Sequence, residues 1–135
     1  MNPEALDKLR SLATDIGIPI RVSGSCMSPL LKNQASILIR SHSWYWPGDI
    51  LTFLDRNGRL TTHRLLGMFP RNGKLYCLTR PDRHLHPDAA VPSSHILGKV
   101  VGGECHAEAI HIPWTVRWLC LKRFALHILR HLLRQ

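Results

Sequence analysis

Two Asn-Gly pairs constrain the fold of this chain more than any other feature. Asn57-Gly58 and Asn72-Gly73 each lie between two segments rich in aliphatic and β-branched residues. Asn and Gly tolerate the positive φ angles of tight turns, so such a pair is a strong signal for a β-hairpin. Residues 49–54, 59–69 and 74–79 are therefore predicted to form consecutive antiparallel strands of a meander.

The remaining segments complete a mainly β prediction. Residues 3–16 are predicted to form a short N-terminal helix, because apolar side chains recur there at helical spacing and Gly17 follows as a stop. Apolar and β-branched residues predict three more strands and one further extended segment. The strands are residues 18–22, 36–40 and 96–101, and the extended segment is 104–112.

The chain is strongly basic for its size. Its 135 residues, enough for one domain with its own core, include 18 Lys and Arg against 9 Asp and Glu, a formal net charge of +9. Such a surface attracts an anionic partner, whether nucleic acid, an anionic membrane or an acidic peptide. No acidic residue follows Glu108, so part of the excess belongs to the C-terminal segment.

Residues 114–135 are predicted to form a basic amphipathic helix. One side of it carries Trp118, Leu121, Ala125, Ile128, Leu129 and Leu132. The other side carries Arg123, His127, Arg130, His131 and Arg134. Two interpretations fit this pattern. The helix lies flat on an anionic membrane, or it packs on the sheet and leaves a basic face in solvent.

The cellular compartment is predicted from what the chain lacks. It contains no run of about 18 uncharged apolar residues, so no membrane-spanning helix is expected. Its first 21 residues include Glu4, Asp7 and Asp15 and have no apolar stretch like that of a secretory signal. The four cysteines are therefore expected to be reduced, in the cytoplasm or at the inner face of the membrane.

A cysteine and a histidine form a candidate catalytic pair. Cys26 lies among small residues in segment 22–29, directly after a predicted strand, and His63 lies in the middle of a later strand. A nucleophile on a tight loop with a histidine base is a pattern of covalent catalysis, and an adjacent imidazole lowers the pKa of a thiol from about 8.5. The alternative is that both residues are simply buried in the core.

Five short blocks occur in a recognisable order across about residues 22–101. They are Ser23-Gly24-Ser25-Cys26-Met27-Ser28-Pro29, Gly48-Asp49-Ile50-Leu51-Thr52-Phe53, His63-Arg64, Thr79-Arg80-Pro81-Asp82 and Gly98-Lys99-Val100-Val101. In the residues and the order of these blocks, the chain resembles the clan of signal peptidases and LexA-type self-cleaving peptidases. The His-Arg block is similar to that of the branch found in the endoplasmic reticulum, archaea and spore-formers.

The resemblance implies a fold and a set of catalytic roles. It implies an antiparallel, mainly β peptidase fold, matched over about residues 22–101. With its flanking segments this peptidase domain is expected to span residues 1–113, and the helix predicted from its pattern follows over residues 114–135. Cys26 stands where the family has a nucleophilic serine, and His63 is the general base. Asp82 or Asp88 orients His63; the match to the family's aspartate block favours Asp82, whereas the spacing to its second aspartate favours Asp88.

Further residues of the Cys26 loop are assigned to the oxyanion and to the substrate. The backbone N–H of Cys26, helped by a hydroxyl of Ser23 or Ser25, would stabilise the oxyanion. Met27, Pro29 and the aromatic residues 44–46 are expected to shape the cleft or the core. The implied substrate is a peptide or protein segment with small residues before the cut, bound as an added strand.

Two departures from the family keep a second function open. Cysteine replaces serine, and the membrane anchor of signal peptidases is absent. The alternative is a catalytically inactive binding module that contacts an anionic membrane or nucleic acid. Sequence-specific binding of DNA is not expected, because the roughly 22 residues before the loop are too few for a helix-turn-helix domain.

No cofactor or metal is expected from the sequence. Several residues have side chains of the type that ligate zinc, but none of the known zinc spacings occurs. These residues are His84, His86, Cys105, His106 and His111.

Overall fold

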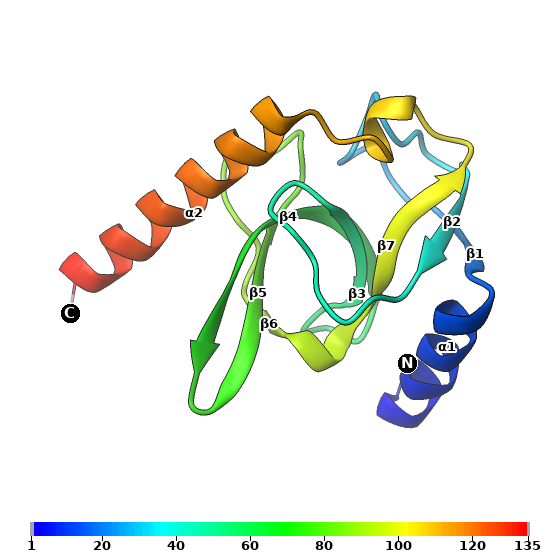
Figure 1. Cartoon of the computed structure of the whole chain (residues 1–135), viewed down its shortest axis with the longest axis horizontal. Coiled ribbons are helices and arrows are strands. Elements are labelled where there is room, and N and C mark those ends of the chain that lie inside the picture. Colours follow the sequence, from blue (N-terminus) through cyan, green and yellow to red (C-terminus); the bar gives the residue numbers. More distant parts are fainter. Residues whose placement is uncertain (1, 135) are drawn as a thin grey trace.

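The computed structural model describes residues 2–134, which form one curled antiparallel sheet with a helix at either end (Figure 1). The helices are α1 (Pro3–Asp15) and α2 (Trp114–Leu133), with short 3₁₀ turns η1 (Ser93–His95) and η2 (Ala107–Ala109). The strands are β1 (Ile18–Arg21), β2 (Ser36–Arg40), β3 (Ile50–Leu54), β4 (Leu60–Arg71), β5 (Lys74–Arg80), β6 (Val91–Pro92) and β7 (Ile96–Gly103).

The mainly β prediction is confirmed, and so are all six predicted strands and the N-terminal helix. Strands β3 to β6 form an antiparallel meander, and the turn between β4 and β5 has positive φ at both Asn72 (51°) and Gly73 (77°), as the hairpin signal requires. The order of strands is β1-β2-β7-β3-β4-β5-β6. The insertion of β7 between β2 and β3 was not predicted, because it joins segments far apart in the sequence.

The prediction of an extended segment over residues 104–112 is wrong. The chain leaves the sheet at Gly103, whose φ is +96°, and then forms the turn η2. Gly103 is required there, since a Cβ atom would lie 2.6 Å from the carbonyl oxygen of Ser36. The Glu104 carboxylate accepts a hydrogen bond from the Ser36 N–H at 2.9 Å, which holds the departing chain against β2.

Helix α1 covers one half of the sheet. Asn2 caps it by accepting a hydrogen bond from the Ala5 N–H at 2.8 Å. Its buried residues, Leu6 and Ala13, join a core cluster with side chains from β1, β2, β3 and β7. This cluster also contains Val22, Met27 and Leu31, so the loop that carries Cys26 is part of the core and has a fixed position.

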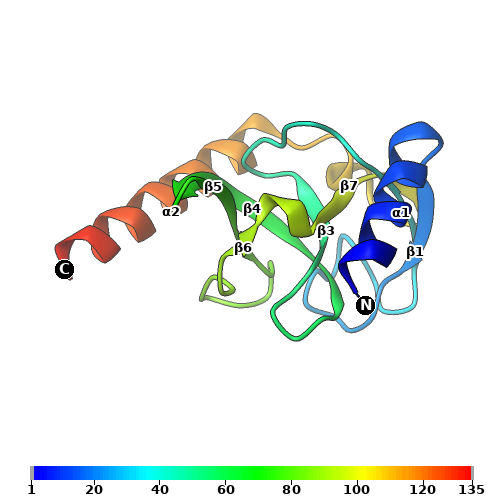
Figure 2. The same cartoon turned by 90° about the horizontal axis from the view of Figure 1, so that it is seen from below.

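Helix α2 packs across β4 and β5 through a narrow row of side chains. Cys120 is buried, and Val116 and Phe124 pack beside it against Leu66 and Leu78 of the strands. At its N-terminal end Arg117 donates hydrogen bonds to Asp49 and to the carbonyl oxygen of Pro47, at 3.0 and 3.1 Å. The last turns of α2 extend beyond the strands (Figures 1 and 2).

The face of α2 that packs is not the one that the sequence predicted. Most of the predicted apolar side, including Trp118, Leu121, Leu129 and Leu132, is exposed. The helix therefore packs on the sheet, as one of the two interpretations held. It does so through the row of Val116, Cys120 and Phe124, which belongs to neither of the two predicted sides, and its widest apolar surface stays uncovered. None of the helices within residues 2–134 has the length and apolar character needed to cross a bilayer.

Gly67 sets how closely α2 approaches β4. A Cβ atom at this position would lie 2.5 to 2.6 Å from three ring carbons of Phe124. We expect Gly67→Ala to push the ring and α2 outward and to lower the free energy of unfolding by about 1–3 kcal/mol, the usual cost of overpacking. Urea unfolding followed by tryptophan fluorescence measures this.

The matched control is Gly102→Ala in β7. A Cβ atom there meets only the Leu38 side chain, at an ordinary 3.7 Å. We expect this substitution to change stability by less than about 0.5 kcal/mol. Equal unfolding midpoints for the two variants would contradict the role given to Gly67.

Candidate active site

Cys26 and His63 line one cleft of about 540 Å³. Its walls come from β1, the Cys26 loop, the β3–β4 loop and the first half of β4. In the sheet β1 and β4 are separated by β2, β7 and β3, yet residues of both strands line the cleft, because the sheet is curled (Figure 1). Three charged residues that the sequence analysis did not select also line it: Arg21, Asp55 and Arg59.

His63 is held by Asp88. The Nδ1 atom of His63 lies 2.6 Å from Oδ2 of Asp88, and the same carboxylate oxygen accepts a 2.8 Å hydrogen bond from the buried Thr79 hydroxyl. The ring also makes an edge-to-face contact with Phe53. With Nδ1 engaged by the carboxylate, Nε2 is the ring nitrogen left to exchange a proton with a nucleophile.

Asp82 has a different partner. Its two carboxylate oxygens accept hydrogen bonds from Nε and Nη2 of Arg64, at 2.8 and 2.9 Å, and Nη1 of Arg64 donates to the Gly48 carbonyl at 2.8 Å. Burial acts to lower the pKa of Arg64, but the hydrogen bonds and charge of Asp82 hold it above its usual range. Of the two candidate aspartates, the structure thus places Asp88 on His63 and Asp82 on Arg64.

The Cys26 loop is fixed by contacts on both of its sides. Asn33 accepts a hydrogen bond from the Gly24 N–H at 2.9 Å. The Cys26 carbonyl accepts one from the Arg83 N–H at 3.0 Å, and the sulfur of the buried Met27 accepts one from the Asp82 N–H at 3.3 Å. Residues 82–88 therefore contact both the loop of the candidate nucleophile and the candidate base.

In the described part of the chain, the thiol of Cys26 and the ring of His63 both line the cleft, and no hydrogen bond joins them. Such bonds are often long in unliganded enzymes and shorten when substrate binds. Within residues 2–134 the backbone N–H of Cys26 likewise has no acceptor, which leaves it available to an oxyanion.

All four cysteines are free thiols, and Cys26 is the one placed in this cleft. Cys77 and Cys120 are buried, and burial raises the pKa of the Cys77 thiol to about 12. Burial also raises the pKa of Cys105 and of Cys120. These three thiols are therefore expected to react slowly with a reagent for thiolates.

The other residues predicted for the site are divided between the cleft and the surface. Ser23 and Met27 line the cleft. Ser25 and Pro29 are exposed and lie outside its lining. Of the aromatic residues 44–46, Tyr45 is in the core and the two tryptophans are exposed, in edge-to-face contact with each other.

The structure adds residues that the sequence analysis missed. Thr79 supports Asp88, and its only signal was its membership of the fourth block. Arg64 was signalled by the His-Arg block, but its partner was not. Nothing in the sequence indicated the hydrogen bond from Arg83 to Cys26, because it depends on how the loop after β5 folds.

No group of three or more His, Cys, Asp or Glu side chains in the described part of the chain is arranged to hold a metal ion. Comparison with known proteins adds no identification, since no family model and no curated protein matches this chain. A functional assignment therefore depends on the geometry of the cleft and on the sequence blocks that build it.

The two aspartates should respond differently to loss of charge. Arg64 is 8 % exposed, so Asp82→Asn leaves a buried guanidinium with a much weaker partner. We expect this substitution to lower the free energy of unfolding by about 3 kcal/mol, as when other buried ion pairs are broken. Chemical denaturation of the purified variant measures the loss.

Asp88→Asn, the same chemical change six residues later, is the control. His63 can become neutral, and an amide oxygen can still accept its hydrogen bond, so we expect a loss below about 1.5 kcal/mol. Similar losses for the two variants would contradict the structural role assigned to the pair of Arg64 and Asp82.

Proposed function

We propose that this chain is a signal peptidase-like endopeptidase that uses Cys26 as nucleophile, His63 as general base and Asp88 to orient the base. The single observation that carries the proposal is the cleft that Cys26 and His63 both line, with Nδ1 of His63 2.6 Å from Oδ2 of Asp88. A nucleophile and an oriented base in one cleft are the parts that acyl transfer requires. The order of the five sequence blocks supports the same assignment.

In the proposed reaction Nε2 of His63 takes the proton of the Cys26 thiol, and the sulfur attacks the scissile carbonyl carbon. The oxyanion of the tetrahedral intermediate accepts a hydrogen bond from the Cys26 N–H, with the Ser23 hydroxyl as a second donor. His63 then gives its proton to the departing amine, which leaves a thioester on Cys26. A water molecule, deprotonated by His63, hydrolyses the thioester and restores the thiol.

The substrate that fits this arrangement is an extended peptide segment. Strand β1 stands at the end of the sheet, and Pro19, Ile20 and Arg21 of this strand line the cleft. A peptide can add to the free edge of β1 through main-chain hydrogen bonds and so lie across Cys26. The carboxylate of Asp55 and the guanidinium of Arg59 on the opposite wall would then contact its side chains.

The first test is the rate of alkylation of Cys26 as a function of pH. We expect labelling to stay fast well below pH 8 and to fall at least about ten-fold in His63→Ala, since one unit in the pKa of a thiol changes its thiolate fraction ten-fold. Asp88→Asn should reduce the rate less, because the imidazole remains. Mass spectrometry of the labelled peptides follows each cysteine.

Cys77 and Cys120 are internal controls, since both are buried and should label only on unfolding. Labelling of Cys26 like an ordinary thiol, unaffected by His63→Ala, would remove the physical basis of the proposal. It would favour the alternative of an inactive peptidase fold that serves as a binding module.

The second test is cleavage of a mixture of unstructured peptides, with products identified by mass. We expect the parent protein to cut some of them after small residues and Cys26→Ala to lose at least about 10³-fold in rate, because the nucleophile is gone. Cys105→Ala, which also removes a half-exposed thiol, should cut at the parental rate. Equal cleavage by the two variants would mean that Cys26 is not the nucleophile.

A further inference from the structure

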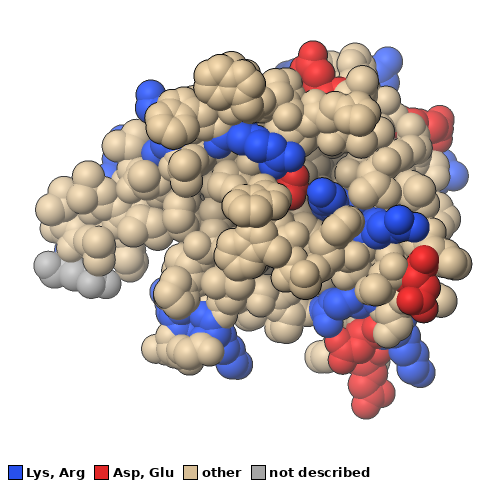
Figure 3. Space-filling view, viewed as in Figure 1, with Lys and Arg blue, Asp and Glu red and all other residues tan. Residues whose placement is uncertain are grey.

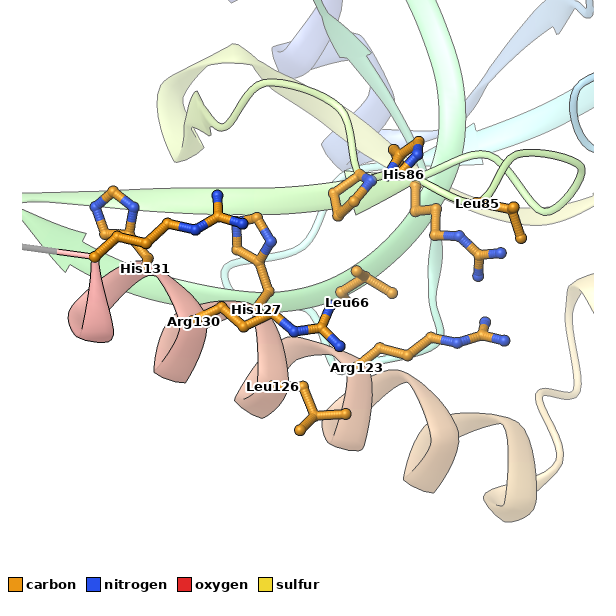
Figure 4. A pocket seen from close by; sticks show the side chains of 11 residues that line it. Leu66, Leu85, His86, Arg123, Leu126, His127, Arg130 and His131 are labelled. Carbon is orange, nitrogen blue, oxygen red and sulfur yellow. The ribbon is translucent and has the colours of Figure 1, made fainter.

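A second cleft, of about 610 Å³, lies between α2 and the loop after β5. Four arginines line it: Arg80, Arg123, Arg130 and Arg134. Three histidines line it as well, and among residues 2–134 no acidic residue does. Figure 4 shows Arg123, His127, Arg130 and His131 projecting from one side of α2, with Leu85 and His86 coming from the loop. We call this the cationic cleft.

The charges of the cationic cleft repel one another. Burial and the nearby charge of Arg123 lower the pKa of Arg80, while Asp82 acts in the opposite direction. The carboxylate of Asp82 is already bound twice by Arg64. Nε of Arg80 is buried without a hydrogen-bond acceptor in the described part of the chain. A buried donor without a partner is costly, and this cost adds to the repulsion between the positive charges at Arg80.

The pKa of His127, on helix α2, also reflects the surplus of positive charge in the cationic cleft. Burial lowers its pKa, and the charges of His131, Arg130 and Arg134 lower it further. Arginine forks match the geometry of phosphate oxygens with paired N–H donors. The chemistry of the cationic cleft is therefore that of a site for phosphate groups.

A large apolar surface adjoins the cationic cleft. Along α2 the exposed apolar residues include Trp114, Trp118, Leu121, Leu126, Leu129 and Leu132. Trp46 continues this surface, since it lines a mostly apolar hollow together with Trp114 and Trp118. In Figure 3 the part of the surface that α2 forms is mainly tan with a few blue side chains. Isolated soluble domains rarely expose so many large apolar side chains together.

Two leucines connect the apolar surface to the cationic cleft. Leu126 of α2 and Leu85 of the loop both line the cleft, and they are 49 % and 85 % exposed. Phosphate-binding groups beside exposed leucines and tryptophans match the boundary between the head groups and acyl chains of a bilayer. Nucleic acid would satisfy the arginines but would leave the apolar surface in water.

We propose that this face is a docking surface for a bilayer of anionic phospholipid, with the apolar half of α2 in the interface and lipid phosphates in the cationic cleft. The proposal is independent of catalysis, but the two surfaces share one loop. Leu85, His86 and Pro87 line the cationic cleft, while Asp88 contacts His63 and Arg83 contacts Cys26. Docking would bring the candidate active site close to the membrane.

The test is co-sedimentation of the full chain with phosphatidylcholine vesicles that contain or lack phosphatidylglycerol. We expect binding only to the anionic vesicles, and Arg123→Gln/Arg130→Gln should lower the partition coefficient about thirty-fold, since each arginine near an anionic surface contributes a factor of about five. Trp118→Ala/Leu129→Ala should lower it about ten-fold or more through lost apolar contact. Both pairs are exposed, so folding is preserved.

The matched control is Lys8→Gln/Arg40→Gln, which removes two exposed positive charges outside the cationic cleft and should lower binding less than about three-fold. An equal loss in this control would show that net charge alone acts, and would overturn the proposal. Binding at the parental level by either test variant would also overturn the proposal.

A different outcome would assign the cleft to nucleic acid. In that case the chain would bind duplex DNA, lose this binding in Arg123→Gln/Arg130→Gln, and show no preference for anionic vesicles. Cys26→Ala should bind vesicles as the parent does, which separates this proposal from catalysis.

Discussion

The geometry around the candidate active site depends on the buried guanidinium of Arg64. It donates hydrogen bonds to both carboxylate oxygens of Asp82 and to the Gly48 carbonyl, so it joins β4 to the loop after β5 and to the turn before β3. Burying this charge is tolerable only because its donors are satisfied together. Once Asp82 is fixed, its neighbours in the loop are placed as well, and Arg83 reaches Cys26 while Asp88 reaches His63.

Local patterns in the sequence predicted the strands because their signals are local. Asn72-Gly73 forms the turn that its residue types favour, and helix α1 ends next to Gly17. The position of β7 between β2 and β3 has no such signal. It depends on a close approach of backbones at Gly98, where a Cβ atom would lie 2.6 Å from the Arg40 carbonyl oxygen. The sequence contains that glycine but does not reveal what it approaches.

The same limit applied to the candidate site. Cys26 and His63 were selected from residue type and motif, and the structure places both in one cleft. The sequence alone leaves Asp82 and Asp88 open, because the match to the family's aspartate block favours the first and the spacing favours the second. It depends on competition: Arg64 carries a permanent charge and a planar fork that suits two carboxylate oxygens, so it pairs with Asp82. Asp88, next to Thr79, is then the carboxylate that remains for His63.

Helix α2 shows why amphipathic patterns do not identify a partner. The sequence pattern pointed to the widest apolar side, yet the sheet accepts only the narrower row of Val116, Cys120 and Phe124. The reason lies in the surface of β4, where the missing side chain of Gly67 leaves room for the ring of Phe124. Cys120 and Val116 lie on the same side of the helix and pack with this ring. A helix with two apolar faces and one packing site in its own domain must leave one face uncovered. The face left uncovered lies beside the arginines, so the proposed docking surface combines an apolar part with a cationic part.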